Sequence, residues 1–185
     1  MKPKTATRYT GVAIGLHWLM AAAIVAGFAL GWTMAAMEFS PQKLRMMSWH
    51  KWLGITILGL VALRLLWRLT HPAPPLPATV PLWQRGAAHA VHVLLYLLMF
   101  AIPLSGWLYS SASGVPVVYL GLWPLPDLIG VDEDLADRLR SLHEWLNYTL
   151  LVAVAVHVGA ALKHHLIERD DVLARMLPIV GRREP

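Results

Sequence analysis

The histidines are the residues of this chain whose type and spacing point to chemistry. The chain has 9 His, and the four that bear most on its chemistry lie within or at the edge of long apolar stretches: His17, His50, His143 and His157. An ionisable side chain is costly inside a bilayer, so an intramembrane histidine is a candidate functional residue. His143 and His157 are separated by 14 positions. At about 100° and 1.5 Å per residue, both rings leave one helix face, about 21 Å apart along the axis.

Two imidazoles on one face at two depths suit two stacked haems, each with one axial ligand from this helix. The second ligands must come from other helices at matching depths. His17 lies just inside the start of the first apolar stretch and His157 just before the end of the fourth. His50 and His143 each open a helix and precede similar residues, Lys51-Trp52-Leu53 and Glu144-Trp145-Leu146. We therefore predict two ligand pairs, His17/His157 and His50/His143, in six-coordinate centres suited to electron transfer.

Other metal chemistry fits the composition less well. The chain has no Cys, which excludes iron–sulfur clusters, thiolate-bound zinc and covalently attached c-type haem. Zinc and di-iron sites in helical bundles gather their ligands at one level and usually include carboxylates. No Asp or Glu lies within an apolar core, since Glu144 is at a helix mouth. A hydrolytic Ser/His/Asp triad would lack its orienting acid at depth for the same reason.

Alternatives remain open for individual histidines. A single histidine in an apolar helix can be no more than a hydrogen-bonding contact between helices. His89 and His92 lie three positions apart on one face of the third predicted helix. They could replace His17 as a ligand or lie near a quinone site. His164 and His165 are expected at the membrane interface, where contact with lipid headgroups is the simpler interpretation.

Membrane helices must position these residues. The chain is 57% hydrophobic and 15% charged, whereas a soluble domain is about a quarter charged. A membrane-spanning helix needs about 20 mostly apolar residues, and the stretches at about 12–37, 48–69, 86–110 and 142–165 meet this requirement. We predict an all-α, integral membrane four-helix bundle with up-down topology, built as a single domain over residues 1–185.

The distribution of basic residues predicts the orientation. Four spans place both termini on one side, together with the link between the second and third spans. The Lys and Arg residues of this side are Lys2, Lys4, Arg8, Arg64, Arg68, Arg85, Lys163, Arg169, Arg175, Arg182 and Arg183. Those of the other side are Lys43, Arg45, Lys51, Arg138 and Arg140. The positive-inside rule therefore predicts that both termini are cytoplasmic. The first span is too long for a signal peptide, so we expect it to be retained.

The connections differ in character. The link at 71–77 is rich in proline and should be extended. The outer connection is expected to be a long loop over 111–141, with an acidic run at 132–134. Its apolar part at 115–123 could lie on the membrane surface as a cap.

These motifs together resemble the bacterial cytochrome b561 family, from about Tyr9 to Pro178. The resemblance rests on His17-Trp18 after a short basic tail, His50 at the start of the second helix, and Arg64 and Arg68 before the proline-rich link. It also rests on Gly86-Ala87-Ala88-His89-Ala90-Val91-His92 and on the His143/His157 pair followed by Ala161-Leu162-Lys163-His164-His165. The resemblance implies a four-helix cytochrome of the bacterial inner membrane with two haem b groups. Its axial ligands carry over onto the four histidines already paired by depth.

The same resemblance implies a superoxide oxidase, which passes electrons from periplasmic superoxide to ubiquinone. It implies a quinone region at the cytoplasmic haem edge, near His164, His92, Trp18 and Arg85. The basic residues that flank the outer ligands, Lys51 and Arg138 among them, could steer superoxide electrostatically, although lipid phosphates are an alternative partner for them.

Another possible function is an electron-relay subunit that links a periplasmic dehydrogenase or hydrogenase to the quinone pool. A third is a structural or transport protein with incidental histidines. Superoxide, quinone and membrane lipid are the expected partners, and nucleic acid is not.

Overall fold

Four long helices make up most of the chain in the computed structural model, which describes residues 8–77 and 79–177. They are α1 (Gly11–Ala36), α2 (Pro41–Thr70), α3 (Leu82–Ala112) and α4 (Glu133–Lys163). All four are long and apolar enough to cross a membrane. This confirms the all-α four-helix fold. The basic residues Lys2, Lys4, Arg182 and Arg183 of the orientation argument lie outside the described residues.

Local capping explains where three of the helices begin. Thr10 accepts a hydrogen bond from the Ala13 amide at the start of α1, and Ser40 does the same for the Lys43 amide at the start of α2, each at 3.2 Å. At the start of α4, Asp132 accepts from the Leu135 amide at 2.9 Å. These side chains satisfy amides that have no partner within the helix. Ser40 and the following proline explain why α2 begins at Pro41 rather than near 48.

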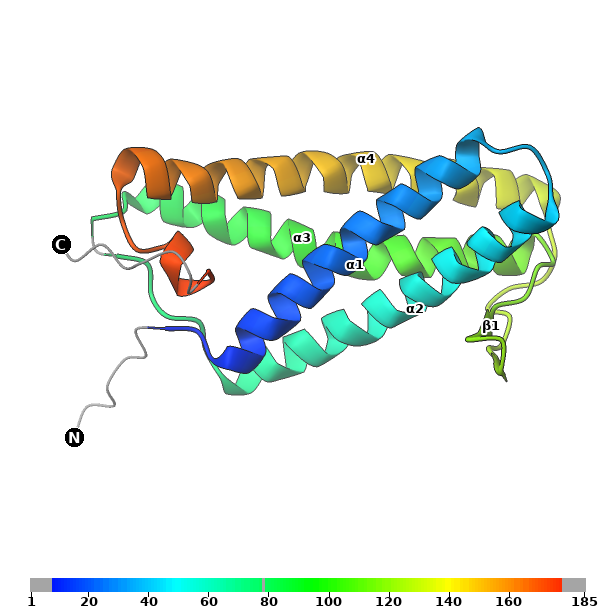
Figure 1. Cartoon of the computed structure of the whole chain (residues 1–185), viewed down its shortest axis with the longest axis horizontal. Coiled ribbons are helices and arrows are strands. Elements are labelled where there is room, and N and C mark those ends of the chain that lie inside the picture. The colour runs from blue at the N-terminus through cyan, green and yellow to red at the C-terminus, as the bar shows by residue number, and fades with distance from the viewer. Residues whose placement is uncertain (1–7, 78, 178–185) are drawn as a thin grey trace.

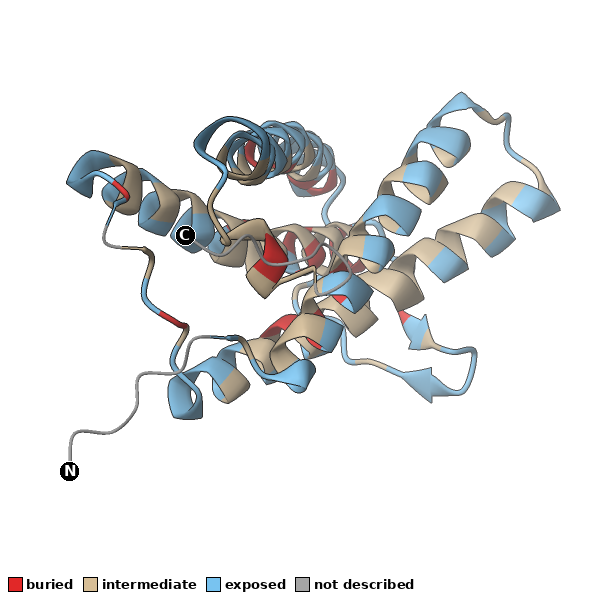
Figure 2. Cartoon of the chain, turned by 60° about the vertical axis from the view of Figure 1, so that its left-hand side comes forward, coloured by how far each residue is buried: buried red, intermediate tan, exposed pale blue. Residues whose placement is uncertain are grey.

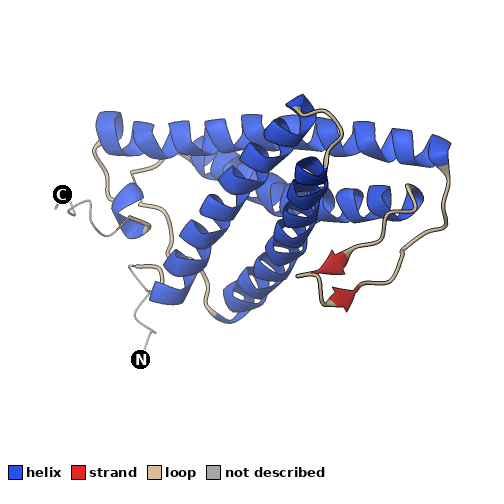
Figure 3. Cartoon of the chain, turned by 45° about the vertical axis from the view of Figure 1, so that its right-hand side comes forward, coloured by secondary structure: helices blue, strands red, loops and turns tan. Residues whose placement is uncertain are grey.

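The outer connection differs from the prediction. We expected a loop over 111–141, but α4 begins at Glu133, so the connection is considerably shorter. The acidic run at 132–134 is not part of a loop, because it supplies the N-cap and first turn of α4, where negative charge is favourable. The segment expected as an apolar cap contains a short antiparallel hairpin of β1 (Val118–Tyr119) and β2 (Trp123–Pro124) (Figure 3).

Successive helices run in opposite directions, as the predicted up-down topology requires (Figure 1). Helix α1 packs against α2, α2 against α3, and α3 against α4. Leu98, Leu150 and Ala153 form a small buried cluster between α3 and α4, on which Phe28 of α1 also packs. We call the end of the bundle with the start of α1 and the end of α4 the inner end, and the opposite end the outer end.

Most of the helical surface is not covered by the chain itself. Exposed and half-buried residues together make up most of all four helices (Figure 2), and large apolar side chains are among the exposed ones. Such a surface would aggregate in water but is the normal exterior of a helix that faces lipid. The interior of the bundle is therefore where polar groups are informative.

Beyond α4 the chain turns back over the inner end. A five-residue π-helical turn, η1 (His164–Glu168), ends at Arg169, whose φ of 56° is left-handed. The chain then reaches the short 3-10 helix η2 (Leu173–Arg175). Arg175 donates to the Pro75 carbonyl at 2.6 Å, and Trp18 donates to the Met176 carbonyl at 2.9 Å. This segment therefore ties α1, α4 and the proline-rich link together.

Candidate functional site

The four predicted ligand histidines meet in the two predicted pairs. At the outer end, the ring centroids of His50 on α2 and His143 on α4 are 6.2 Å apart, with ring planes at 80°. At the inner end, the ring centroids of His17 on α1 and His157 on α4 are 6.1 Å apart, at 66°. Both pairs therefore join α4 to another helix, at two levels of one bundle.

The spacing of each pair fits a metal ion between two imidazoles. A transition metal lies about 2.0 Å from an imidazole nitrogen, and the ring centre lies about 1.1 Å behind that nitrogen, so two rings on one ion have centroids about 6 Å apart. His92 is the alternative inner ligand, and its centroid lies 5.2 Å from that of His157. This is about 1 Å shorter than the ideal spacing. The geometry therefore favours His17 over His92 as the partner of His157.

Hydrogen bonding leaves one nitrogen of His143 free for a ligand bond. Its Nδ1 lies 3.0 Å from the Ile102 carbonyl oxygen and 3.0 Å from Ser105 Oγ. A carbonyl oxygen can only accept, so Nδ1 carries the ring proton and Nε2 keeps its lone pair. Metal-bound histidines are commonly held this way, because the second hydrogen bond sets both the tautomer and the ring orientation. Ser105 is a residue that sequence reasoning missed.

Gly106 provides space for the same ring. A Cβ atom at this position would lie 3.1 Å from His143 Cε1 and 3.3 Å from its Nδ1. A side chain there would require the imidazole to move by a few tenths of an ångström. The absence of a side chain at Gly106 is therefore part of how α3 positions His143.

Replacement of Gly106 by Val should reduce occupancy of the outer haem to below about half, because overpacking displaces the ring that would hold it. Gly59→Val is the matched control, since a Cβ there meets nothing within 4 Å. Haem-to-protein ratios from pyridine haemochrome spectra provide the measurement. Full haem content in the Gly106 variant would contradict the assignment of His143.

A cavity beside the outer pair has the character expected of a haem pocket. It contains about 500 Å³ of space, part of it open to the surface, and is lined by His50, His143 and apolar residues of all four helices. Gly27 and Gly54 lie in its wall, where small residues allow a flat group to approach the backbone. The residues present therefore fit a haem with axial ligands from α2 and α4.

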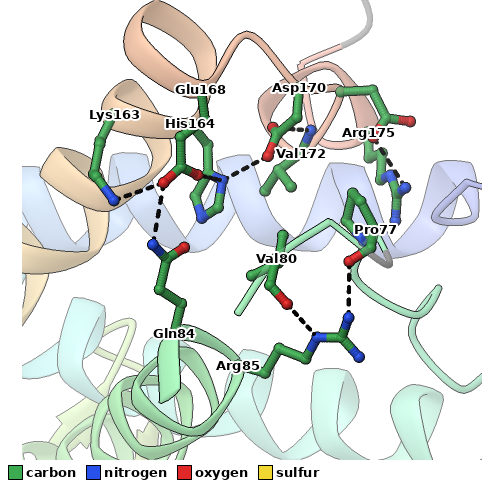
Figure 4. Close-up of polar contacts among 11 residues, drawn as sticks. Pro77, Val80, Gln84, Arg85, Lys163, His164, Glu168, Asp170, Val172 and Arg175 are labelled. Atoms are coloured by element: carbon green, nitrogen blue, oxygen red, sulfur yellow. Dashed lines mark hydrogen bonds and ion pairs between the residues drawn. The ribbon is translucent and has the colours of Figure 1, made fainter. Parts of the chain in front are cut away.

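The inner end contains a polar cluster around His164 (Figure 4). The Nδ1 atom of His164 lies 2.6 Å from a carboxylate oxygen of Glu168 and 2.6 Å from one of Asp170. Lys163 and Gln84 donate to the other Glu168 oxygen, at 2.7 and 3.1 Å. His164 is a predicted quinone-side residue, whereas its two carboxylate partners were missed because the chain reversal at Arg169 brings them together.

The other predicted quinone-side residues are near the inner pair to different degrees. Trp18 is next to His17, with ring centroids 5.2 Å apart, and His92 contacts His157. Arg85 donates to the carbonyls of Val80 and Pro77, so it fastens the proline-rich link to α3 (Figure 4). The structure thus gives Arg85 a positioning contact, while the two aromatic rings border the inner histidines.

The predicted steering residues also differ from each other. Lys51 is half-buried, donates to the Val115 carbonyl at 3.0 Å, and is subject to the negative charge of Asp127. Arg138 lies exposed on the first turns of α4. Nearby, Trp52 donates to the Val118 carbonyl at 2.6 Å and fixes the hairpin to α2. Arg138 is therefore the more accessible of the two cations.

Comparison with known proteins shows what the whole chain is similar to. The family model described as prokaryotic cytochrome b561 matches residues 8–178. The chain is 38% identical over 175 residues to cytochrome b561 homolog 2 of Escherichia coli strain K12, covering 94% of this chain and 93% of that protein. It is 32% identical over 177 residues to the probable superoxide oxidase CybB of Yersinia pestis, with 92% and 96% covered. It is also 31% identical over 179 residues to cytochrome b561 homolog 1 of Escherichia coli, with 92% and 97% covered.

The match runs through all four helices and both histidine pairs. A family model that spans nearly the whole described chain, together with relatives of similar length, leaves no segment of the bundle outside the likeness. Members of this family bind b-type haem and take part in electron transfer. From its sequence, its four membrane-spanning helices and these relatives, the chain belongs to the prokaryotic cytochrome b561 family.

Proposed function

We propose that this membrane cytochrome carries two haem b groups and transfers electrons from superoxide to ubiquinone. The observation that carries the proposal is the pair of ligand-spaced histidine couples at opposite ends of one apolar bundle. The relative from Yersinia pestis named a probable superoxide oxidase supports the choice of donor. In the proposed orientation, the inner end faces the cytoplasm and the outer end faces the periplasm of the bacterial inner membrane.

Four histidines hold the cofactors in this proposal. His50 and His143 ligate the outer iron, and His17 and His157 ligate the inner iron. When bound, the haems supply one-electron carriage across the bundle. With both protein ligands of the outer iron supplied by His50 and His143, the site would offer superoxide no open position on the metal, so the electron would be taken up at the edge of the site. Ser105 and the Ile102 carbonyl maintain the His143 orientation on which this depends.

The outer end supplies the approach for the substrate. Superoxide is a small anion, so exposed cations near the outer pair raise its local concentration and encounter rate. Arg138 is exposed for this role, while Lys51 contributes charge from a half-buried position. Each of two superoxide ions loses one electron and leaves as O₂.

The inner end supplies the quinone site and its protons. Ubiquinone takes up the two electrons and two protons to become ubiquinol, which balances the oxidation of two superoxide ions. His164 is the proposed proton donor, because Glu168 and Asp170 hold its Nδ1 and thereby orient the ring, and its Nε2 would contact the quinone. Trp18 and His92 contact the inner histidine pair, and Arg85 fastens the proline-rich link to α3 at the same end of the bundle.

The function is tested by pulsing superoxide onto the purified cytochrome that contains ubiquinone. Rapid appearance of the reduced b-type α-band, release of O₂ and formation of ubiquinol by this chain alone would support the proposal. If no haem reduction occurs until a periplasmic redox protein is added, the chain is an electron-relay subunit instead. Complete absence of a b-type spectrum would overturn both functions.

Reversal of charge at the outer end should slow the first step. In a Lys51→Glu, Arg138→Glu double variant, we expect the second-order rate of haem reduction by superoxide to fall about tenfold or more at low salt, with both haems retained. The difference should shrink as salt screens the charges. Stopped-flow absorption at several ionic strengths provides the measurement.

The control for this experiment is the Lys51→Gln, Arg138→Gln variant. It also removes the Lys51 bond to the Val115 carbonyl but introduces no negative charge. A rate between those of the wild type and the Glu variant is expected. Equal rates in all three proteins would exclude electrostatic steering by these residues.

A further inference from the structure

Arg64 occupies a position on α2 that corresponds to that of an inner ligand on α4. His50 and Arg64 are separated by 14 positions, as are His143 and His157. This spacing returns to within about 40° of the same helix face and advances about 21 Å. The face of α2 that presents His50 to the outer site therefore presents Arg64 at the level of the inner histidine pair.

The contacts of Arg64 place its charge beside that pair. Its Nε donates to the Tyr96 hydroxyl of α3 at 3.1 Å, and the side chain is half-buried. The 14-position spacing from His50 places the guanidinium at the level of His17 and His157. Arg64 and Tyr96 also line a cavity of about 290 Å³, partly open, between the inner ends of α1, α2 and α3.

No carboxylate of the described chain compensates this cation. The ion pairs in residues 8–77 and 79–177 use the acidic groups of the inner end elsewhere: Glu168 and Asp170 contact Lys163 and His164, and Asp171 contacts Arg175. A guanidinium within a spanning helix is costly unless an anion accompanies it. The guanidinium of Arg64 therefore needs an anionic partner, and the described chain does not supply one.

We propose that Arg64 binds a propionate carboxylate of the inner haem, with Tyr96 orienting the guanidinium. This inference rests on the inner haem of the proposed function. A carboxylate matches the planar fork of Arg and can be bound by two parallel hydrogen bonds. A lipid phosphate offers similar chemistry, but it would meet Arg68 first, which lies one turn nearer the end of α2 and is exposed. Arg64 therefore acts as a positioning residue that also sets the electrostatics of the inner site.

A cation beside the inner haem favours its reduced form, because reduction lowers the positive charge of the iron. In Arg64→Gln, the ratio of reduced to oxidised inner haem at a given ambient potential should fall about tenfold, which corresponds to a midpoint shift of about −59 mV for one electron. Potentiometric titration of the purified holoprotein, followed at the b-type α-band, measures the shift. The outer midpoint should remain unchanged, because the substitution is about 21 Å from the outer pair along α2.

Infrared spectroscopy identifies the anion. Cells grown on labelled 5-aminolevulinate produce haem with ¹³C-labelled propionates, and redox-induced difference spectra then reveal the carboxylate bands that move with the label. We expect these bands to differ between the wild type and Arg64→Gln. Arg68→Gln is the matched control: it removes the same charge from the same helix, and its smaller midpoint shift should leave the labelled bands unchanged.

The outcomes separate this proposal from its alternatives. Unchanged labelled bands, or equal midpoint shifts in the Arg64 and Arg68 variants, would overturn it. A shift that depends on the anionic lipid content of nanodiscs while the labelled bands stay the same would assign Arg64 to lipid phosphate. If Arg64→Gln loses the inner haem, Arg64→Lys should retain it, and equal loss in both would also overturn the proposal. None of these results affects the presence of two haems, which the wild-type spectrum tests separately.

Discussion

Replacement of His50 by Ala should remove the outer haem and leave the inner haem bound, so that the haem content per chain falls by about half. Replacement of His17 should produce the complementary loss at the inner end. In the proposed arrangement each iron has two imidazole ligands from different helices, and a chain that supplies only one of them cannot keep a six-coordinate low-spin centre. Pyridine haemochrome assays give the haem-to-protein ratio, and redox titration shows which of the two midpoints has disappeared.

His92→Ala is the matched control for the inner site. The centroid of His92 is 5.2 Å from that of His157, whereas that of His17 is 6.1 Å away, and only the longer spacing matches two ligands on one metal. We therefore expect His92→Ala to keep both haems. If this variant loses the inner haem while His17→Ala keeps it, the ligands must be exchanged in the assignment. If all single histidine variants keep both haems, the four-ligand arrangement itself is wrong.

Helical periodicity and depth were sufficient to predict which histidines lie next to each other. The 14-residue separation of His143 and His157 places both rings on one face of α4 whatever the neighbouring helices do. Pairing by depth succeeded because straight helices of similar length cross the same apolar layer, so residues equally far from the ends meet at one level. The prediction that His17 and His157 lie together used only the periodicity of α4 and the matching depths of the two residues.

Contacts that depend on packing or on chain reversal were not predictable in this way. Ser105 and Gly106 act on His143 from α3, and nothing in their sequence spacing indicates which face of α3 meets α4. Glu168 and Asp170 surround His164 only because the chain leaves the regular helix in a π-helical turn and reverses at Arg169. Periodicity does not extend across such a break.

The start of α4 was predicted too late for a different reason. Hydropathy alone predicts a loop for the charged residues at 132–140, whereas the N-cap Asp132 and the acidic first turn stabilise a helix that projects beyond the apolar layer.

By contrast, the spacing of Arg64 from His50 was visible in the sequence. An intramembrane cation on the same face as a ligand can be found from sequence alone, once basic residues are examined with the same periodicity as histidines.

His164→Ala should uncouple the two ends of the cytochrome. His164 follows His157 by seven positions, which places it on nearly the same helix face about 10 Å further toward the inner surface. Its Nδ1 is held by Glu168 and Asp170 at 2.6 Å each, and in the proposed role its Nε2 faces the quinone. If it delivers protons to ubiquinone, its loss should slow ubiquinol formation about 100-fold or more. Haem reduction by superoxide should keep its wild-type rate, because the proposed site of that step is at the outer end.

Single-turnover stopped flow separates these two phases, since the b-type α-band appears as electrons enter and decays as they pass to ubiquinone. Asp170→Asn should slow only the decay, and by a smaller factor than His164→Ala, because the imidazole remains but loses a carboxylate that orients it.

His165→Ala serves as the control, since it removes a neighbouring imidazole that leaves the helix in another direction. If the decay phase is as fast in His164→Ala as in His165→Ala, protons reach the quinone by another route and His164 has no part in its reduction. If both phases slow together, the substitution has disturbed the haem sites instead, and an altered haem content would reveal this.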